Sequence, residues 1–477
     1  MSEGALLLLL PELLVLAGAL IGFLLAVTEA SRRIGWVVSL LFALGAAAAA
    51  AATILQRGQP FFPRIYQVDL FSQVVKAGLG VALFLVLLIS RDLPTVRPWI
   101  RREVPMFLFL TTLGMMMLAS ATELLTLYVA MEFSAYGLYI LVALHRAQRP
   151  GSEAAAKYVL FGAAASAVTL YGISLLFGVG GSTYLADLYR ADLAASPLFL
   201  VGLVMTMAGF FYKLSLFPFH FWTPDAYQAA PHPVTTFLAS ASKLAAMALL
   251  ARATGVLASS SPARLMDLLL VLSVASMTLG NLAALVQKDL KRLLAYSTIA
   301  HAGYMVVGLY AFSSTGHASA LFYALTYVPV AITAFVVISA LDPEGDKNPT
   351  FESLAGLYKR SPALALLLLV AMFGLAGIPP TVGFAGKWFV FAAALERGQF
   401  ALVLIAAVNS TVGLYYYLQV IRAAFLTPAA DETPLRAPAG HLLAGYGSAL
   451  LSLGLGIFPG PLWLISELAA GALRAWS

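Results

Sequence analysis

The sequence contains no cysteine and few charged residues. None of its 477 residues is a cysteine, and Asp, Glu, Lys and Arg together make up 10%, whereas soluble domains contain about 25% charged residues. Without thiols, the chain holds no disulfide bond, iron–sulfur cluster or thiolate metal site of its own. Its six histidines form no pair at ligand spacing on one expected helix. We therefore expect no cofactor-binding or metal site in this chain.

Hydrophobic residues dominate what remains, at 61% of the chain. A helix needs about 20 mainly apolar residues to cross a bilayer, and strand periodicity is absent. Fourteen candidate spans begin near Ala5, Gly35, Val74, Val104, Glu123, Lys157, Pro197, Pro233, Leu265, Leu293, His317, Pro362, Phe400 and Leu442. The pattern predicts an all-α, polytopic membrane protein of about 14 transmembrane helices, because a chain in lipid must satisfy its own backbone polar groups.

The basic residues predict the orientation of these helices. The net charge of +6 is explained by Lys and Arg in short loops, so we do not expect a nucleic-acid partner. Loops after odd-numbered helices hold more than twice as many Lys and Arg residues as the other loops. Such loops are cytoplasmic, which places both termini on the outer side. We assign Arg252 to an outer loop, and we expect Lys76, near a helix start, to extend to the interface.

Two parts of the sequence resemble each other and indicate an internal repeat. Residues Glu132–Tyr139 and Ser297–Tyr304 are alike, and the apolar runs around Pro218 and Pro379 both contain a central proline at a similar separation. These pairs correspond to helices 5 and 10 and to helices 7 and 12. Since a five-helix unit re-enters the membrane upside down, we predict two inverted five-helix repeats. The expected segments are residues 1–103 (helices 1–3), 104–256 (first repeat), 265–426 (second repeat) and 440–477 (helix 14).

The central prolines have a consequence for the site. Pro218 and the pair Pro379–Pro380 each remove a backbone donor and are expected to break helices 7 and 12. Broken helices at matching positions of two repeats indicate a transport site, because exposed backbone at membrane depth persists only beside protein or water. The alternative is a simple proline kink.

Four ionisable residues fall deep within apolar segments. They are Glu132, Lys213, Lys243 and Lys387. A charge at the bilayer centre costs about 3 kcal/mol on insertion scales, so we interpret these residues as functional. The deep basic residues are lysines and not arginines, and lysine releases a proton where arginine does not. An opposite charge keeps a buried lysine protonated, and separating the pair lets it release its proton.

Each of these residues also has a structural alternative. Lys243 could cap a helix carbonyl, Lys387 could extend to the interface, and Glu132 could stay protonated. The functional hypothesis is proton transfer, with further relay groups at His220, His232, Tyr296, His301 and Tyr304. Histidine suits this role because it titrates near neutral pH, although packing is an equal alternative for His301.

Two other places leave both interpretations open. Residues Lys288–Arg292 are interpreted either as a cytoplasmic basic loop or as part of a relay. Glu12, in the first helix, is either functional or a residue near the outer interface.

Three motifs resemble a known family. They are LSLFPFHFWTPDAYQAAPHPVTTFLASASK (residues 214–243), QKDLKRLLAYSTIAHAGY (287–304) and GLAGIPPTVGFAGKWF (374–389). All three are similar to motifs of the antiporter-like membrane subunits of respiratory complex I, and the likeness spans roughly helices 4 to 13. Within that family, the chain most resembles the group called subunit N of bacterial NADH–quinone oxidoreductase. It lacks a long C-terminal lateral helix, and it has Lys387 where the subunit M group has glutamate.

The resemblance implies a role and a set of partners. The complex oxidises NADH, reduces a quinone and pumps protons across the bacterial plasma membrane, so this chain would be a non-redox, proton-translocating subunit of that enzyme. FMN, iron–sulfur clusters and quinone would be held by partner subunits of the membrane and peripheral arms. By motif position, Glu132 and Lys213 correspond to the glutamate of helix 5 and the lysine of helix 7. Lys243 and Lys387 correspond to the connecting lysine of helix 8 and the terminal lysine of helix 12. His232 stands where many relatives have a small residue.

Other functions stay open at this point. One is a subunit of a multi-subunit Na⁺/H⁺ antiporter, and another is a membrane subunit of a hydrogenase-type complex. A purely structural scaffold is a third.

Overall fold

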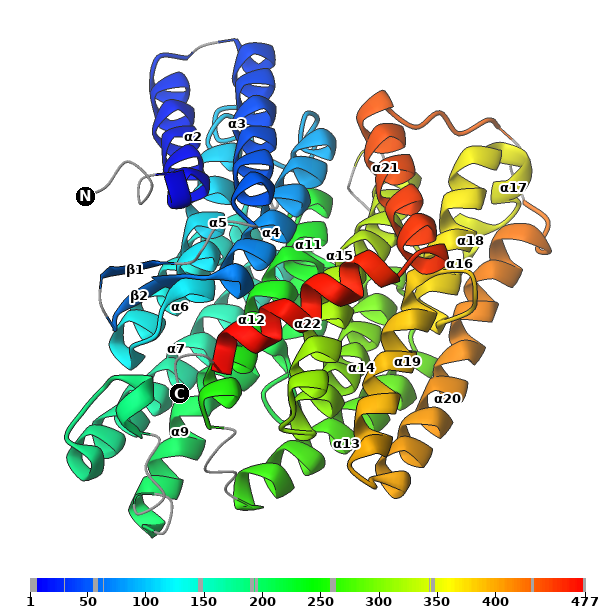
Figure 1. Cartoon of the computed structure of the whole chain (residues 1–477). Helices are drawn as coiled ribbons and strands as arrows, with labels where there is room; N and C mark the ends of the chain where they lie inside the picture. Colours follow the sequence, from blue (N-terminus) through cyan, green and yellow to red (C-terminus); the bar gives the residue numbers. More distant parts are fainter. Residues whose placement is uncertain are drawn as a thin grey trace.

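The structure of the chain is a computed structural model that is almost entirely helical (Figure 1). It describes residues 7–474 except 30, 55–58, 63, 145–148, 189–192, 194–195, 258–262, 343, 345–347 and 430–432. Among these residues the strands are β1 (Gln59–Phe62) and β2 (Tyr66–Val68), an antiparallel pair in which Gln59 faces Val68. The predicted all-helical membrane fold is therefore confirmed.

The helices fall into three groups along the chain. The first group is α2 (Leu10–Val27), α3 (Arg32–Thr53), α4 (Leu70–Ile89), α5 (Val104–Ser120), α6 (Leu124–Ala143), α7 (Arg149–Gly180) and α9 (Pro197–Leu214), with a 3₁₀ turn at Leu185–Leu188. The second is α10 (Trp222–Ala229), α11 (His232–Ala239), α12 (Ala241–Leu257), α13 (Ala263–Leu285), α14 (Leu290–Tyr310) and α15 (Ser314–Leu341). The last is α16 (Phe351–Leu354), α17 (Leu357–Arg360), α18 (Pro362–Ala376), α19 (Val382–Glu396), α20 (Phe400–Phe425), α21 (Ala439–Ile457) and α22 (Gly460–Arg474).

Acidic residues begin three of these helices. The Asp69 carboxylate accepts from the Ser72 backbone N–H at 2.7 Å, that of Glu123 from Thr126 at 2.6 Å, and that of Asp289 from Arg292 at 2.9 Å. Each satisfies one of the backbone donors that a helix leaves unpaired at its start, and its charge also complements the helix dipole. These caps fix where α4, α6 and α14 begin.

Twelve helices in the described part of the chain are long and apolar enough to cross a membrane. Three shorter apolar helices, Val104–Ser120, Pro362–Ala376 and Gly460–Leu473, accompany them. The number of fourteen spans therefore stays a prediction, as do the boundaries of the two repeats. The predicted outer location of both termini concerns residues 1–6 and 475–477, which lie outside the described residues.

Both predicted helix breaks are present. Helix 7 consists of α9, which ends at Leu214, and α10, which begins at Trp222; helix 12 consists of α18 and α19, separated between Ala376 and Val382. The residue after each first half is left-handed, Ser215 with φ 68° and Gly377 with φ 82°. A further interruption at Ser240, between α11 and α12, was not predicted.

The C-terminal segment differs from the expected single helix over residues 440–477. The chain forms α21 and then α22, which begins just after Pro459 and lies across α12 and α15 (Figure 1). Proline has no backbone N–H to continue the preceding helix, so the chain changes direction there.

The helices divide into an interior and a periphery. All of the span His232–Gly255 is buried within the chain, and so is 94% of the apolar window in α14 and in α15. In contrast, 28% of the window in α3 and 33% of that in α20 is buried. Lys243 therefore lies on the most enclosed helix of the molecule.

Close packing of α13 on α14 depends on glycine. A Cβ atom added to Gly280 would lie 2.6 Å from the backbone nitrogen of Ala300 and 2.8 Å from the carbonyl oxygen of Tyr296. Backbone atoms at that distance cannot yield without moving the helices apart. The backbone of α14, which carries His301, is thus held against α13 at this point.

We expect Gly280→Val to destabilise the folded chain by about 1–3 kcal/mol, as overpacking of a core does. The measurement is the fraction of purified protein that stays monodisperse after heating in detergent, followed by size-exclusion chromatography. Gly454→Val is the control, because no atom lies within 4 Å of a Cβ atom there. Equal heat tolerance of the two variants would contradict this packing argument.

Candidate functional site

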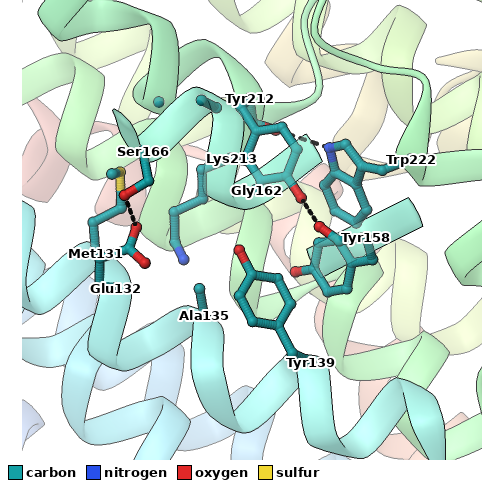
Figure 2. A pocket seen from close by; sticks show the side chains of 12 residues that line it. Met131, Glu132, Ala135, Tyr139, Tyr158, Gly162, Ser166, Tyr212, Lys213 and Trp222 are labelled. Atoms are coloured by element: carbon teal, nitrogen blue, oxygen red, sulfur yellow. Dashed lines mark hydrogen bonds between the residues drawn. The ribbon is translucent and has the colours of Figure 1, made fainter. Parts of the chain in front are cut away.

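A small polar cavity joins Glu132 on α6 to Lys213 on α9. Figure 2 shows the Lys213 side chain pointing between the Glu132 carboxylate and the Tyr139 hydroxyl. Lys213 Nζ donates to Ser134 Oγ at 2.6 Å, and Ser166 Oγ donates to Glu132 Oε1 at 2.8 Å. The cavity has a volume of about 20 Å³, which is enough to hold one water molecule.

Glu132 and Lys213 form no direct ion pair among the salt bridges of the described residues, since each is held by a serine. Lys213 is 6% exposed, whereas Glu132 is partly exposed to the cavity. Because burial weakens dielectric screening, a carboxylate across such a cavity still acts on the ammonium group. The arrangement lets the charge of Glu132 control the proton on Lys213 without locking the two together.

Aromatic side chains close the same cavity on the other side. Tyr158 stacks on Trp222 with ring centroids 4.4 Å apart, and Tyr139 meets Tyr158 edge to face at 4.7 Å. Tyr212 Oη donates to the Tyr158 backbone carbonyl at 2.8 Å, and Trp222 Nε1 donates to the Tyr212 carbonyl at 3.1 Å. These rings come from α6, α7, α9 and α10, so the cavity is formed where the broken helix meets its neighbours.

The first helix break connects Lys213 to Lys243. Where α9 ends, its last carbonyls have no partner within the helix. The Lys243 ammonium group, 1% exposed, donates to the Lys213 backbone carbonyl at 3.4 Å and to Ser215 Oγ. It also lies 4.8 Å from the centroid of the Trp222 ring, a favourable cation–π contact. A negative helix end and an aromatic face thus stabilise the Lys243 cation.

A second lysine caps the other half of this broken helix. Lys291, on the first turn of α14, is 2% exposed. Its Nζ donates to the Gln228 carbonyl at 2.9 Å and to the Ala230 carbonyl at 2.8 Å, just where α10 ends. Of the two interpretations of residues Lys288–Arg292, an exposed basic loop does not hold for Lys291, although Lys288 is exposed.

Lys387 occupies the second break in the corresponding way. Its Nζ donates to the Ala376 carbonyl at 2.7 Å, to the Leu375 carbonyl at 3.2 Å and to Ser410 Oγ at 2.9 Å. A Cβ atom on Gly377 would approach the Lys387 Cδ atom to 2.9 Å, so glycine makes room for the lysine. Lys387 is 7% exposed and does not extend to the interface.

Polar side chains of α14 and its neighbours lie between the two breaks. The His301 ring, 3% exposed, is placed with Nδ1 2.8 Å from Tyr323 Oη and Nε2 3.1 Å from Tyr417 Oη. Thr298 Oγ1 lies 2.9 Å from Tyr327 Oη, whose ring is 5.0 Å from that of His301. One turn further on, the centroid of the Tyr304 ring is 5.2 Å from Lys387 Nζ.

Two residues that we expected in a relay lie apart from this line. The His220 ring packs on Phe217 and Phe221, with centroids 5.7 and 4.5 Å away. Tyr296 is partly buried against the core. No hydrogen bond within the described residues connects either side chain to a buried lysine.

His232 lines a separate cavity at one end of α11. Its Nε2 atom is 3.3 Å from Asp342 Oδ2, and His441 Nε2 is 2.9 Å from Ser339 Oγ on the same cavity. Asp92 also lines the cavity, which has a volume of about 50 Å³. Sequence reasoning missed Asp342 and His441, because they come from distant helices and carry no motif.

Two placements of basic residues were wrong. Lys76 does not reach the interface: it is 0% exposed, and its Nζ is 2.6 Å from Glu12 Oε1. Arg252 is not in a loop: it lies within α12, is 2% exposed, and forms an ion pair with Asp69 at 3.0 Å. A deep arginine therefore exists after all. Both errors have one cause, because a charge near the end of an apolar run looks interfacial until a buried partner is known.

The chain resembles known proteins along nearly its whole length. The profile of the family described as "NADH:quinone oxidoreductase/Mrp antiporter, TM" matches residues 121–413, a range that includes the four deep ionisable residues. "NADH-quinone oxidoreductase subunit N 2" of Syntrophobacter fumaroxidans is 45% identical over 471 residues, covering 97% of this chain and 98% of that protein.

Solved structures agree with this likeness. A chain of respiratory complex I from Thermus thermophilus with bound aureothin has a TM-score of 0.82 at 36% identity, covering 95% of this chain and 98% of that chain. A chain of the Mrp complex from Dietzia has a TM-score of 0.89 over 99% of this chain and 98% of that chain, but at 22% identity it shows the fold alone. The chain thus belongs to the family of transmembrane subunits shared by NADH:quinone oxidoreductases and Mrp antiporters.

Proposed function

We propose that the chain is a proton-translocating, non-redox subunit of a bacterial NADH–quinone oxidoreductase, in which protons pass along Glu132, Lys213, Lys243 and Lys387. The observation that carries the proposal is the contact at the first break. Lys213 extends its side chain into the Glu132 cavity and offers its backbone carbonyl to Lys243. Two buried lysines and a carboxylate from three helices thereby meet around the break in helix 7, where a change of charge at one alters the electrostatic field at the next.

Glu132 sets the charge of Lys213 in this proposal. With Glu132 ionised, the Lys213 ammonium group is stabilised across the cavity. When Glu132 is neutralised, Lys213 loses that support and releases its proton. Ser134 and Ser166, together with a water molecule that the cavity is large enough to hold, provide the local hydrogen bonds for that transfer.

Lys243 passes the proton toward the second repeat. The side chains between the breaks supply hydroxyl and imidazole groups, which exchange protons when they are hydrogen-bonded in a chain. His301, held by Tyr323 and Tyr417, is the titratable group of this stretch, and Tyr304 faces Lys387. Lys387 then governs exchange with the outer side. Its ammonium group is held by the backbone carbonyls of Leu375 and Ala376, which are free to accept it because helix 12 is broken there.

The His232 cavity supports a route for proton uptake from the cytoplasm. This cavity is large enough to hold water, and imidazole and carboxylate groups line it, from His232, Asp342, Asp92 and His441. It lies close to the buried Lys291, because the backbone carbonyl of Ala230, two residues before His232, accepts from Lys291. His220 and Tyr296 have supporting roles in this proposal, since within the described residues neither is hydrogen-bonded to a buried lysine.

The redox chemistry belongs to other subunits in this proposal. FMN, iron–sulfur clusters and quinone are held by the partners in the membrane and peripheral arms, and this chain binds none of them. The inverted arrangement of the repeats, predicted from the paired segments, is part of the same proposal. So is the location of both termini outside the bacterial plasma membrane, which the loop charges predict.

The arginine variants of the line test proton release directly. Lys213→Arg, Lys243→Arg and Lys387→Arg keep a positive charge but remove a group that can deprotonate at neutral pH. We expect each to lower the rate of proton pumping roughly tenfold or more while the complex still assembles. The measurement is NADH-driven acidification in proteoliposomes of the whole complex, with subunit content checked by gel.

Lys288→Arg is the matched control, because Lys288 is exposed in the structure. It should pump at the unmodified rate. Pumping at the unmodified rate in the three buried variants would favour the scaffold over the proton channel. Lys213→Met, which removes the charge as well, should behave like Lys213→Arg if proton release is what matters.

Sodium transport is the competing function. Sodium prefers oxygen ligands, and the described residues contain no group of three or more His, Cys, Asp or Glu side chains that could hold a metal ion; the deep line is instead rich in ammonium groups that repel cations. We expect NADH-driven pumping to proceed at the same rate in sodium-free potassium medium, with no uptake of ²²Na⁺. Pumping that requires sodium would replace the proton proposal with an antiporter.

A further inference from the structure

A second cluster of buried charges lies away from the line of Glu132 and the three lysines. Lys76 Nζ is 2.6 Å from Glu12 Oε1, and the Tyr66 hydroxyl donates to the same oxygen at 2.6 Å. The Lys76 side chain is 0% exposed and that of Glu12 10%. These groups come from α2, β2 and α4, all of which precede the residues matched by the family profile.

Beside this pair is a second ion pair of different chemistry. Arg252 donates to both carboxylate oxygens of Asp69 at 3.0 Å and to the Ala119 carbonyl at 2.6 Å. Arginine does not give up its proton in proteins, so this pair is a permanent connection between α4 and α12. In the pair of Glu12 and Lys76, by contrast, each side chain is of a kind that is able to gain or lose a proton. The cluster therefore combines one fixed ion pair with one that is able to titrate.

The cluster is incompletely hydrogen-bonded by the protein. Four buried atoms of the cluster have no hydrogen-bond partner among the described residues, although one of them, Lys76 Nζ, is ion-paired; they are Glu12 Oε2, Gln73 Oε1, Lys76 Nζ and Arg252 Nε. Gln73 lies one turn from both Asp69 and Lys76 on α4 and donates to the Leu8 carbonyl at 2.8 Å. Buried polar atoms of this kind are satisfied by ordered water, so we expect water between these side chains.

The cluster lies at the opposite end of the central helix from the His232 cavity. His232 begins α11, whereas Arg252 is near the end of α12. On α4, Asp69 precedes the first turn and the Asp92 loop follows the last. Lys243 stands between the two ends, nine residues before Arg252, or about 14 Å along a helix. Near Lys243, α4 and α12 are close, because a Cβ atom on Gly78 would lie 2.8 Å from Leu244.

We propose that Glu12, Tyr66 and Lys76 form a proton-exchange site through which the first repeat communicates with the aqueous phase opposite the His232 cavity. The inference rests on the proposed proton transfer. In the resting pair, Glu12 is a carboxylate and Lys76 an ammonium group. Uptake of one proton on Glu12 yields the carboxylic acid, breaks the ion pair and leaves one positive charge on Lys76; release to water restores it.

The groups facing Glu12 favour this exchange. Burial, and then the Glu12 carboxylate, raise the pKa of Tyr66 well above its usual value, so Tyr66 keeps its proton and serves as a donor. The neighbouring Asp69 carboxylate is already paired with the Arg252 guanidinium. The Glu12 side chain is slightly exposed at the surface of the chain, whereas the Lys76 side chain is fully buried in its interior.

Glu12→Gln is the decisive variant. Its amide oxygen still accepts from Tyr66, and its size is unchanged, but it cannot bind a proton. We expect the pumping rate of the complete complex in proteoliposomes to fall roughly tenfold, and Glu12→Asp to restore most of it. Glu29→Gln, at the far end of α2 where Glu29 makes an exposed ion pair with Arg102 at 3.7 Å, should pump normally.

A spectroscopic measurement separates proton exchange from a structural role. Infrared difference spectra of the complex between acidic and alkaline medium should show a protonated carboxyl band that Glu12→Gln removes and Glu12→Asp shifts. If Glu12→Gln does not assemble, Glu12→Gln/Lys76→Met removes both charges together and should assemble without pumping. Normal pumping by the single or the double variant, or a carboxyl band that Glu12→Gln leaves unchanged, overturns the inference. If Glu12→Gln pumps normally and Lys213→Arg does not pump, this inference is wrong but the proposed function stands. If Glu12→Gln and Lys213→Arg both pump normally, the inference and the proposed function are both wrong.

Discussion

The contact on which the rest of the site depends is the one between a lysine ammonium group and the carbonyl end of an interrupted helix. Such an end has unpaired acceptors and a partial negative charge, and inside a membrane neither is tolerated without a partner. Lys243 and Lys291 donate to the carbonyl ends of the two halves of helix 7, and Lys387 donates to the carbonyl end of the first half of helix 12. Each lysine is therefore needed by the backbone and is at the same time a group that is able to exchange a proton.

This double role links stability to transfer. A lysine that loses its proton keeps its hydrogen bonds to carbonyl oxygens but loses the attraction of its charge for the helix end. Deprotonation at Lys387 thus weakens the hold on the Leu375 and Ala376 carbonyls without breaking it. The two breaks differ in one respect, because Lys387 comes from the second half of its own helix, whereas Lys243 comes from a neighbour. The break in helix 12 is therefore capped by a side chain of the same helix, whereas the first half of helix 7 is capped by a side chain of α12.

Much of the fold and part of the site could be predicted from the sequence. Long apolar runs and central prolines are local signals, so the helices, the two breaks and the deep residues Glu132, Lys213, Lys243 and Lys387 were recognisable. Partners are not local. Lys76 and Arg252 were misplaced because Glu12 and Asp69 lie far away in the chain. Lys291 resembles an ordinary loop lysine until the end of α10 is seen against it, and nothing in the sequence signals the interruption at Ser240.

The last helix has a mechanical consequence. The Trp463 ring of α22 stacks on Phe389 with centroids 4.0 Å apart, and both meet Phe322 of α15. Phe389 is two residues from Lys387 on α19, and α22 also packs along α12 and α4. Turning α19 about its axis would therefore require Trp463 to unstack or α22 to slide with it. A rotation of α19 at Lys387 would in this way be transmitted by aromatic contact to α12 and α4, the two helices that bear Lys243 and Lys76.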